Sequence, residues 1–120
     1  MKHKVAGRKF SRVRKQRRAL LKSLLNSFII REKITTTEAK AKELKSIIDS
    51  FIKKAKKVDD KNKVSVIRDL RKTLSGVAVK KLTGEFVRKF DSRKSGYSKI
   101  TKLGRRKGDS AKMAVIEFVS

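Results

Sequence analysis

Lysine and arginine side chains crowd the beginning of the chain. Residues 1–31 contain eleven of them, and the first acidic residue is Glu32. Guanidinium and ammonium groups bind phosphate, and surfaces that are cationic only for solubility usually mix in acids. The cluster predicts a phosphate-rich partner, with a solvated tail as the alternative. The candidate residues are Lys2, His3, Lys4, Arg8, Lys9, Arg12, Arg14, Lys15, Arg17, Arg18 and Lys22.

A second cationic group lies near the end of the chain. Residues 88–112 contain ten basic and two acidic residues, and the run Arg105-Arg106-Lys107 stands between two glycines. This run predicts a hairpin tip that presents charge to a polyanion, with a solvated turn as the alternative. Tyr97 suits stacking on an unpaired base, although packing of its ring inside the fold is slightly favoured. The candidates are Arg93, Lys94, Tyr97, Lys99, Lys102, Arg105, Arg106, Lys107 and Lys112.

Residues suited to catalysis are absent from the sequence. It has no cysteine, one histidine, no phosphate-cradling glycine-rich loop and no HExxH motif. Asp59-Asp60 suits a magnesium ion less well than the cap of a helix. We therefore expect no enzymatic activity, no cofactor, no metal and no small-molecule substrate.

The size and charge of the chain limit its partners. It has 120 residues, enough for one modest core, and a net charge of +25. Such a charge calls for a polyanion, and nucleic acid is favoured over an anionic membrane or an acidic protein. No apolar run is long enough to span a membrane, so no membrane insertion is expected. A membrane-surface peptide would need one continuous basic amphipathic helix, which residues 14–31 match only in part.

Hydrophobic periodicity predicts the elements that position these cations. Spacings of three and four predict helices over residues 14–31, from about 38 to 55, 61–74 (buried through Val64, Ile67, Leu70 and Leu74) and 77–90, while residues 33–36, 97–102 and 113–119 favour strands. Thr37 is placed to cap the second helix. The last two strands form a long hairpin. The sequence predicts one α+β domain over residues 1–120, with a basic arm at 1–13 and a folded core at 14–120.

Three segments resemble a known family from one end of the chain to the other. They are residues 1–10 (MKHKVAGRKF), 34–44 (ITTTEAKAKEL) and 96–117 (GYSKITKLGRRKGDSAKMAVIE). Together, in this order and at this spacing, they resemble bacterial large-subunit ribosomal protein seventeen.

The resemblance implies a fold and a function. The fold is helix, strand, three helices and two strands, with a small three-stranded mixed sheet packed on helices. The function is structural: binding of large-subunit ribosomal RNA near the exit of the nascent-peptide tunnel, beside neighbouring ribosomal proteins, in the cytoplasm. The alternative is a free nucleoid-type nucleic-acid-binding protein, but the second and third helices, which would have to enter a groove, are the least basic part of the chain.

Overall fold

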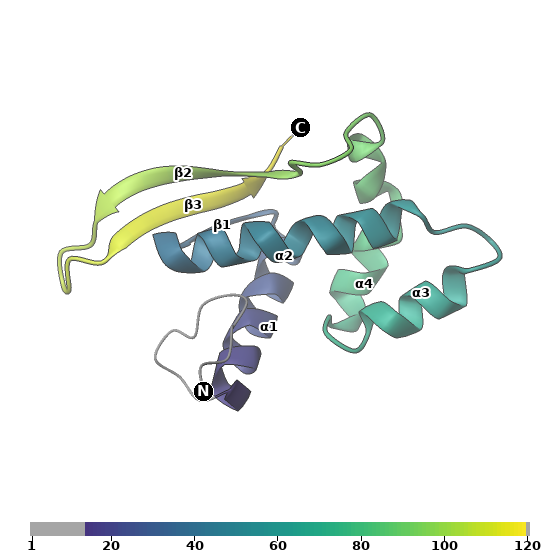
Figure 1. The fold of residues 1–120 in the computed structure, drawn as a ribbon, viewed down its shortest axis with the longest axis horizontal. Coiled ribbons are helices and arrows are strands. Elements are labelled where there is room, and N and C mark those ends of the chain that lie inside the picture. The colour runs from purple at the N-terminus through teal and green to yellow at the C-terminus, as the bar shows by residue number, and fades with distance from the viewer. Residues whose placement is uncertain (1–13, 120) are drawn as a thin grey trace, which may run out of the picture.

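The computed structural model describes residues 14–119, so the predicted arm over residues 1–13 lies outside the described part, as does Ser120. Eight elements follow one another along the chain (Figure 1). They are α1 (Arg14–Arg31), β1 (Lys33–Thr37), α2 (Glu38–Lys56), α3 (Lys63–Leu70), α4 (Gly76–Leu82), the 3-10 helix η1 (Glu85–Phe90), β2 (Ser98–Arg105) and β3 (Lys112–Phe118). The α+β class and the order of helices and strands are confirmed.

The three strands form one sheet in the order β1-β3-β2. β3 is antiparallel to both neighbours. The sheet is therefore antiparallel throughout, and the expectation of a mixed sheet was wrong in this detail. The reason lies in the hairpin: β2 and β3 are joined by a tight turn, which makes them antiparallel. β1 runs in the same direction as β2, but β3 lies between them, so no parallel pair forms.

Helix α2 crosses the middle of the molecule and packs along the sheet (Figure 1). Its buried side chains recur at intervals of three and four residues: Ala41, Leu44, Ile48, Ile52 and Ala55. The apolar pattern of the sequence also placed Ile47 and Phe51 in this stripe, but both are only half-buried. Thr37 ends β1 and caps the helix, because its Oγ1 accepts a hydrogen bond from the Lys40 amide at 3.4 Å. One threonine thus closes a strand and opens the central helix.

Helix α1 is buried only in its second half. Leu25, Phe28 and Ile29 lie in the core, whereas the first turns extend away from α2 (Figure 1). Glu32 ends the helix in the left-handed region with φ of 68°. Its carboxylate accepts a hydrogen bond from Lys81 Nζ at 2.7 Å, which lowers the pKa of Glu32. This contact ties the end of α1 to α4.

The predicted helix over residues 77–90 is wrong as a single element. It breaks after Leu82 into α4 and η1. Gly84 stands at the break, and a Cβ there would come within 3.2 Å of the Lys80 carbonyl oxygen. After the break, η1 buries Val87 and Phe90 in the core.

The third helix is shorter than predicted, at residues 63–70 instead of 61–74. Val64, expected to be buried, is 68% exposed, because this short helix enters the core through Leu70. Leu74 is buried as expected, but in the turn after the helix. Asp59 does not occupy the N-cap position; its carboxylate accepts hydrogen bonds from the amides of Lys61 and Asn62 just before the helix.

Candidate nucleic-acid interface

The described cationic candidates occupy three separate places in the fold. The first, which we call the helical cluster, lies on the projecting half of α1 and consists of Arg14, Lys15, Arg17, Arg18 and Lys22. Arg17 is half-buried and the other four are exposed. None of the five contacts a carboxylate within residues 14–119. Their charge is therefore available to a partner.

The helical cluster stands where the helix itself disfavours it. The amino end of an α-helix carries a partial positive charge, so acids stabilise that end and cations destabilise it. The first turn of α1 holds no acidic residue and begins with Arg14 and Lys15. This arrangement costs stability in the protein alone.

The second place is the β2–β3 hairpin, whose far end extends beyond α2 (Figure 1). A β-bulge interrupts the pairing between Lys102 and Gly104, and Gly104 has φ of 107°. Ser110 also adopts a left-handed conformation, with φ of 58°. The prediction of a hairpin is confirmed, but of its two glycines only Gly104 has positive φ. Ser110 takes the other position that needs it.

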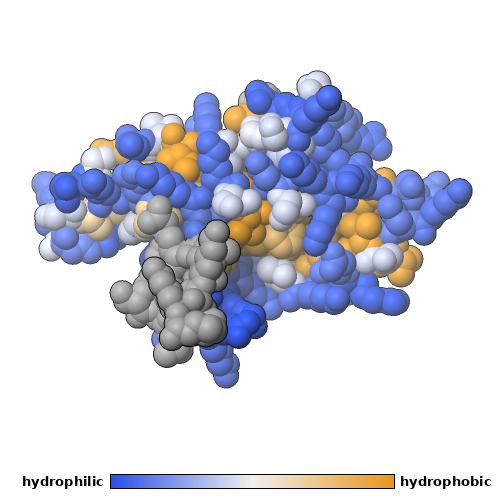
Figure 2. Space-filling view, viewed as in Figure 1, coloured by the Kyte–Doolittle hydropathy of each residue, from blue (hydrophilic) through white to orange (hydrophobic). Residues whose placement is uncertain are grey.

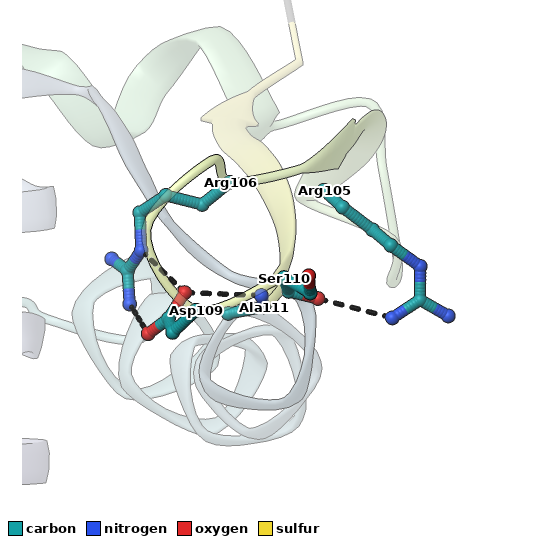
Figure 3. Close-up of polar contacts among 5 residues, drawn as sticks. All are labelled: Arg105, Arg106, Asp109, Ser110 and Ala111. Atoms are coloured by element: carbon teal, nitrogen blue, oxygen red, sulfur yellow. Dashed lines mark hydrogen bonds and ion pairs between the residues drawn. The ribbon is translucent and has the colours of Figure 1, made fainter.

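Side-chain contacts close the tip of the hairpin (Figure 3). The guanidinium of Arg106 donates two hydrogen bonds to the Asp109 carboxylate, at 3.0 and 2.6 Å. Asp109 also accepts one from the Ala111 amide at 3.1 Å. Arg105, which precedes Arg106 at the end of β2, donates a hydrogen bond across the tip to the Ser110 carbonyl oxygen at 3.0 Å. The tip is thereby held in one shape before any partner binds.

The contacts divide the cations of the hairpin into two kinds. Arg106 is neutralised by Asp109, while Lys99 and Lys102 lie 3.5 Å from Glu117 and 3.7 Å from Glu38. The remaining three are exposed and contact no carboxylate among the described residues: Arg105, Lys107 and Lys112. The sequence presented Arg105, Arg106 and Lys107 as equivalent, but the structure shows that they are not.

The pair between Arg106 and Asp109 makes a titration testable. The hydrogen bonds from Arg106 lower the pKa of Asp109 from 3.8 to about 2. Because the pKa is depressed in the folded state, the pair stabilises the tip above pH 3.8 and is lost as the pH falls through about 2. A carboxyl carbon-13 NMR titration of Asp109 should give a midpoint near 2.

Two variants control that titration. In Arg106→Gln the Asp109 midpoint should rise toward 3.8. In Arg105→Gln it should stay near 2, because Arg105 contacts the Ser110 carbonyl and not this carboxylate. A midpoint that ignored Arg106→Gln would mean that the pair does not form in solution.

The third place is the turn before β2, which carries Arg93 and Lys94. Both are exposed, but Tyr97 beside them is 1% exposed. Its ring packs edge-on against Phe90, with the ring centroids 5.4 Å apart, and its hydroxyl donates to the Arg93 carbonyl at 3.3 Å. Lys56 also donates to that carbonyl and lies 5.2 Å above the tyrosine ring. Tyr97 therefore packs inside the fold, as favoured, and the interpretation that it stacks on a base was wrong.

One cation at the interface was missed by the sequence analysis. Lys72 follows α3 in the chain, yet it lines the same groove as Arg18 and Lys22 of the helical cluster. It is exposed and contacts no carboxylate among the described residues. About fifty positions separate it from Lys22, and no local pattern signals that they meet. The cationic candidates at positions 2–12 lie outside the described residues.

Neither a metal-ligand cluster nor a membrane-spanning helix occurs in the described part of the chain. Residues 14–119 contain no group of three or more histidine, cysteine or acidic side chains able to hold a metal ion. None of the helices described is both long and apolar enough to cross a bilayer.

Comparison of this chain with known proteins points to a single family. A family model described as Ribosomal protein L17 matches residues 20–119. Large ribosomal subunit protein bL17 of Staphylococcus carnosus is 40% identical over 119 residues, covering 93% of this chain and 98% of that protein. Proteins of the same name from Shouchella clausii and Salinibacter ruber are each 40% identical, covering 92% and 99% of this chain and 97% and 59% of their own lengths. With its fold and its cationic surfaces, the chain belongs to the ribosomal protein L17 family.

Proposed function

We propose that this protein is a non-catalytic structural constituent of the large ribosomal subunit, in the cytoplasm, and that it binds ribosomal RNA through its basic amino-terminal region and its carboxy-terminal hairpin. The observation that carries the proposal is the set of exposed cations on α1 and at the hairpin tip that contact no carboxylate within residues 14–119. Relatives of similar length named as large-subunit proteins support it. A location near the exit of the nascent-peptide tunnel, beside other ribosomal proteins, is part of the proposal and rests on the resemblance to the family.

The shape of the protein favours folded RNA over a DNA duplex. A helix-turn-helix module needs a cationic recognition helix that is free to enter a groove. Helix α2 is committed to the core by five buried side chains, and α3 has only eight residues. The hairpin and the amino-terminal half of α1 instead extend from the body as two separate projections (Figure 1). Such projections suit the crevices of a folded RNA, where backbone phosphates converge from several helices.

The hairpin is suited to this role because its shape is set in advance. A flexible chain loses conformational entropy when it is ordered on a partner, and this loss reduces affinity. The tip is held by the Arg106–Asp109 pair and by Arg105 on the Ser110 carbonyl. Less entropy remains to be lost when RNA binds. Arg106 thus contributes by shaping the tip, and Arg105, Lys107 and Lys112 contribute charge toward phosphate.

Two double variants separate these contributions. Arg105→Gln with Lys107→Gln removes two cations without carboxylate partners and should lower the slope of log K against log salt by about 1.4 to 1.8 for a ribosomal RNA fragment. Arg106→Gln with Asp109→Asn removes a neutral pair, keeps the net charge and should change the slope by less than about 0.5. Filter binding at salt concentrations from about 50 to about 300 mM gives the salt slope of each variant. An equal drop in the two variants would show that Arg106 itself contacts phosphate.

The proposed place in the cell is tested by sedimentation. A lysate of cells that express the protein is run through a high-salt gradient, and the protein is quantified by mass spectrometry across the fractions. We expect it at one copy per large subunit and in no other fraction. Migration with DNA, or retention at the top of the gradient, would contradict the ribosomal role and favour a free nucleic-acid-binding protein.

A further inference from the structure

An apolar groove opens beside the helical cluster. It has a volume of about 570 Å³ and lies between α1, the middle of α2 and the turn after α3. Leu21, Leu25 and Ile47 supply its apolar lining, together with Ala19 and Thr73. Figure 2 shows apolar surface in the region where α1, α2 and α4 approach one another, with hydrophilic surface around it.

The charged residues that line the groove are all cations. They are Arg18, Lys22 and Lys72, and no acidic side chain lines it. None of the three contacts a carboxylate within the described range. The side chains of Leu21 and Ile47 stay half-buried and accessible from solvent. The groove therefore suits an occupant that is negatively charged and also presents an apolar face.

Charge excludes two occupants that this chain could provide. Residues 1–13 contain five lysines and arginines and no acid, so the cations of the groove would repel them. A second copy of the chain carries a net charge of +25 and is repelled as well. The occupant must come from a different molecule of opposite charge.

We propose that the groove holds an unstacked base of an RNA, with the flanking phosphates on Arg18, Lys22 and Lys72. This inference rests on the proposed function, since it names the kind of nucleotide that the α1 side of the interface recognises. An unpaired nucleotide combines an apolar ring face with an anionic backbone, which is the combination that the groove requires. A duplex exposes its phosphates but keeps its ring faces stacked, so it would leave Leu21 and Ile47 uncovered. Continuity favours RNA over an acidic protein segment, because Arg18 and Lys22 belong to both the groove and the helical cluster.

The test compares two probes of equal length and charge: a single-stranded hexauridylate and the same backbone without bases. With the full chain labelled at its methyl groups, nuclear Overhauser effects should join uracil ring protons to the methyls of Leu21 and Ile47. The hexauridylate should bind about fivefold more tightly than the abasic probe, at the lower end of the effect of one stacked base, because the groove is lined by aliphatic and not by aromatic side chains. This difference should disappear in Leu21→Ala and persist in Val77→Ala, which removes an apolar side chain that is 65% exposed and does not line the groove.

Several outcomes would overturn the assignment. Equal affinity of the two probes, with a steep dependence on salt, would show that the phosphates bind but that the groove takes no base; the proposed function would stand. Absence of binding by either probe would overturn the assignment, while the proposed function would be decided separately by the sedimentation experiment. If a synthetic acidic peptide containing leucine shifted the Leu21 and Ile47 methyls while the hexauridylate gave no ring contact, the groove would belong to a protein segment.

Discussion

Replacing Arg14, Lys15, Arg17 and Arg18 together with glutamine is expected to weaken binding to a ribosomal RNA fragment by about a thousandfold at 0.1 M salt. The slope of log K against log salt should fall by about 3, since each lost phosphate contact removes roughly 0.7 to 0.9. These side chains contact no carboxylate among the described residues, so the substitutions break no ion pair there. Isothermal titration calorimetry over a series of salt concentrations measures both quantities.

The loss of binding should not reflect unfolding. Glutamine is a good helix former, and removal of cations from the first turns of α1 relieves their repulsion with the helix dipole. We therefore expect the thermal midpoint of the variant to stay the same or to rise. A fall in the midpoint, with binding lost in parallel, would mean that the cluster supports the fold and not the interface.

A matched variant controls for net charge. This control replaces four exposed lysines outside the helical cluster with glutamine: Lys53, Lys57, Lys61 and Lys63. They lie at the end of α2, in the segment that follows it and at the start of α3. Net charge falls by the same amount, but the salt slope should change by less than about 1, because nonspecific attraction is screened within about 10 Å at 0.1 M salt. Equal losses in both variants would show that overall charge, and not the position of the helical cluster, determines the affinity.

Replacing Phe118 with alanine is expected to lower the free energy of unfolding by about 3 to 5 kcal/mol. Phe118 comes from β3 and is buried. Its ring stacks on that of Phe28, with the ring centroids 4.2 Å apart, and meets Phe86 edge-on at 5.0 Å and Phe90 at 5.8 Å. Removal of the ring leaves a cavity where α1, η1 and the sheet meet. Domains of this size are stable by only about 5 to 15 kcal/mol, and a net charge of +25 reduces that margin.

Urea unfolding followed by far-ultraviolet circular dichroism measures this effect. The variant should unfold at a much lower urea concentration, or be unfolded without urea. Phe118→Leu keeps much of the volume and should lose less, and the exposed Val77→Ala should stay within about 0.5 kcal/mol of the parent. An unchanged midpoint for Phe118→Ala would contradict the central place of this ring in the core.

The elements with a strong local pattern were predictable from the sequence. Helix α1 ends where the apolar spacing indicated, and the buried residues of α2 all belong to its predicted apolar stripe. Thr37 caps α2 as expected, and the two last strands form the predicted hairpin. These features depend on residues two to four positions apart, whose relation is the same in any fold. The two basic ends and the absence of catalytic motifs were also visible without a structure.

Other features depend on residues far apart in the chain. Tyr97 stands among cations in the sequence, but Phe90 and Lys56 enclose its ring, so packing overrides the local signal. The break at Gly84, where a Cβ would come within 3.2 Å of the Lys80 carbonyl oxygen, interrupts a spacing that by itself predicts one continuous helix. The antiparallel order of the sheet depends on β3 entering between β1 and β2. None of these contacts leaves a periodic trace in the sequence.

Contacts between residues far apart in the chain also decide which cations of the described part lie close to an acid or to the groove. The sequence by itself determined that the chain is strongly basic, that its charge lies toward both ends and that the fold is of the α+β class. Only the tertiary structure decided that Glu117 lies close to Lys99 and Glu38 close to Lys102, and that Lys72 joins Arg18 and Lys22 at an apolar groove. The physical reason is range: periodicity records neighbours along an element, whereas an ion pair or a groove needs atoms within a few ångströms in space, which only the packing of the elements brings together.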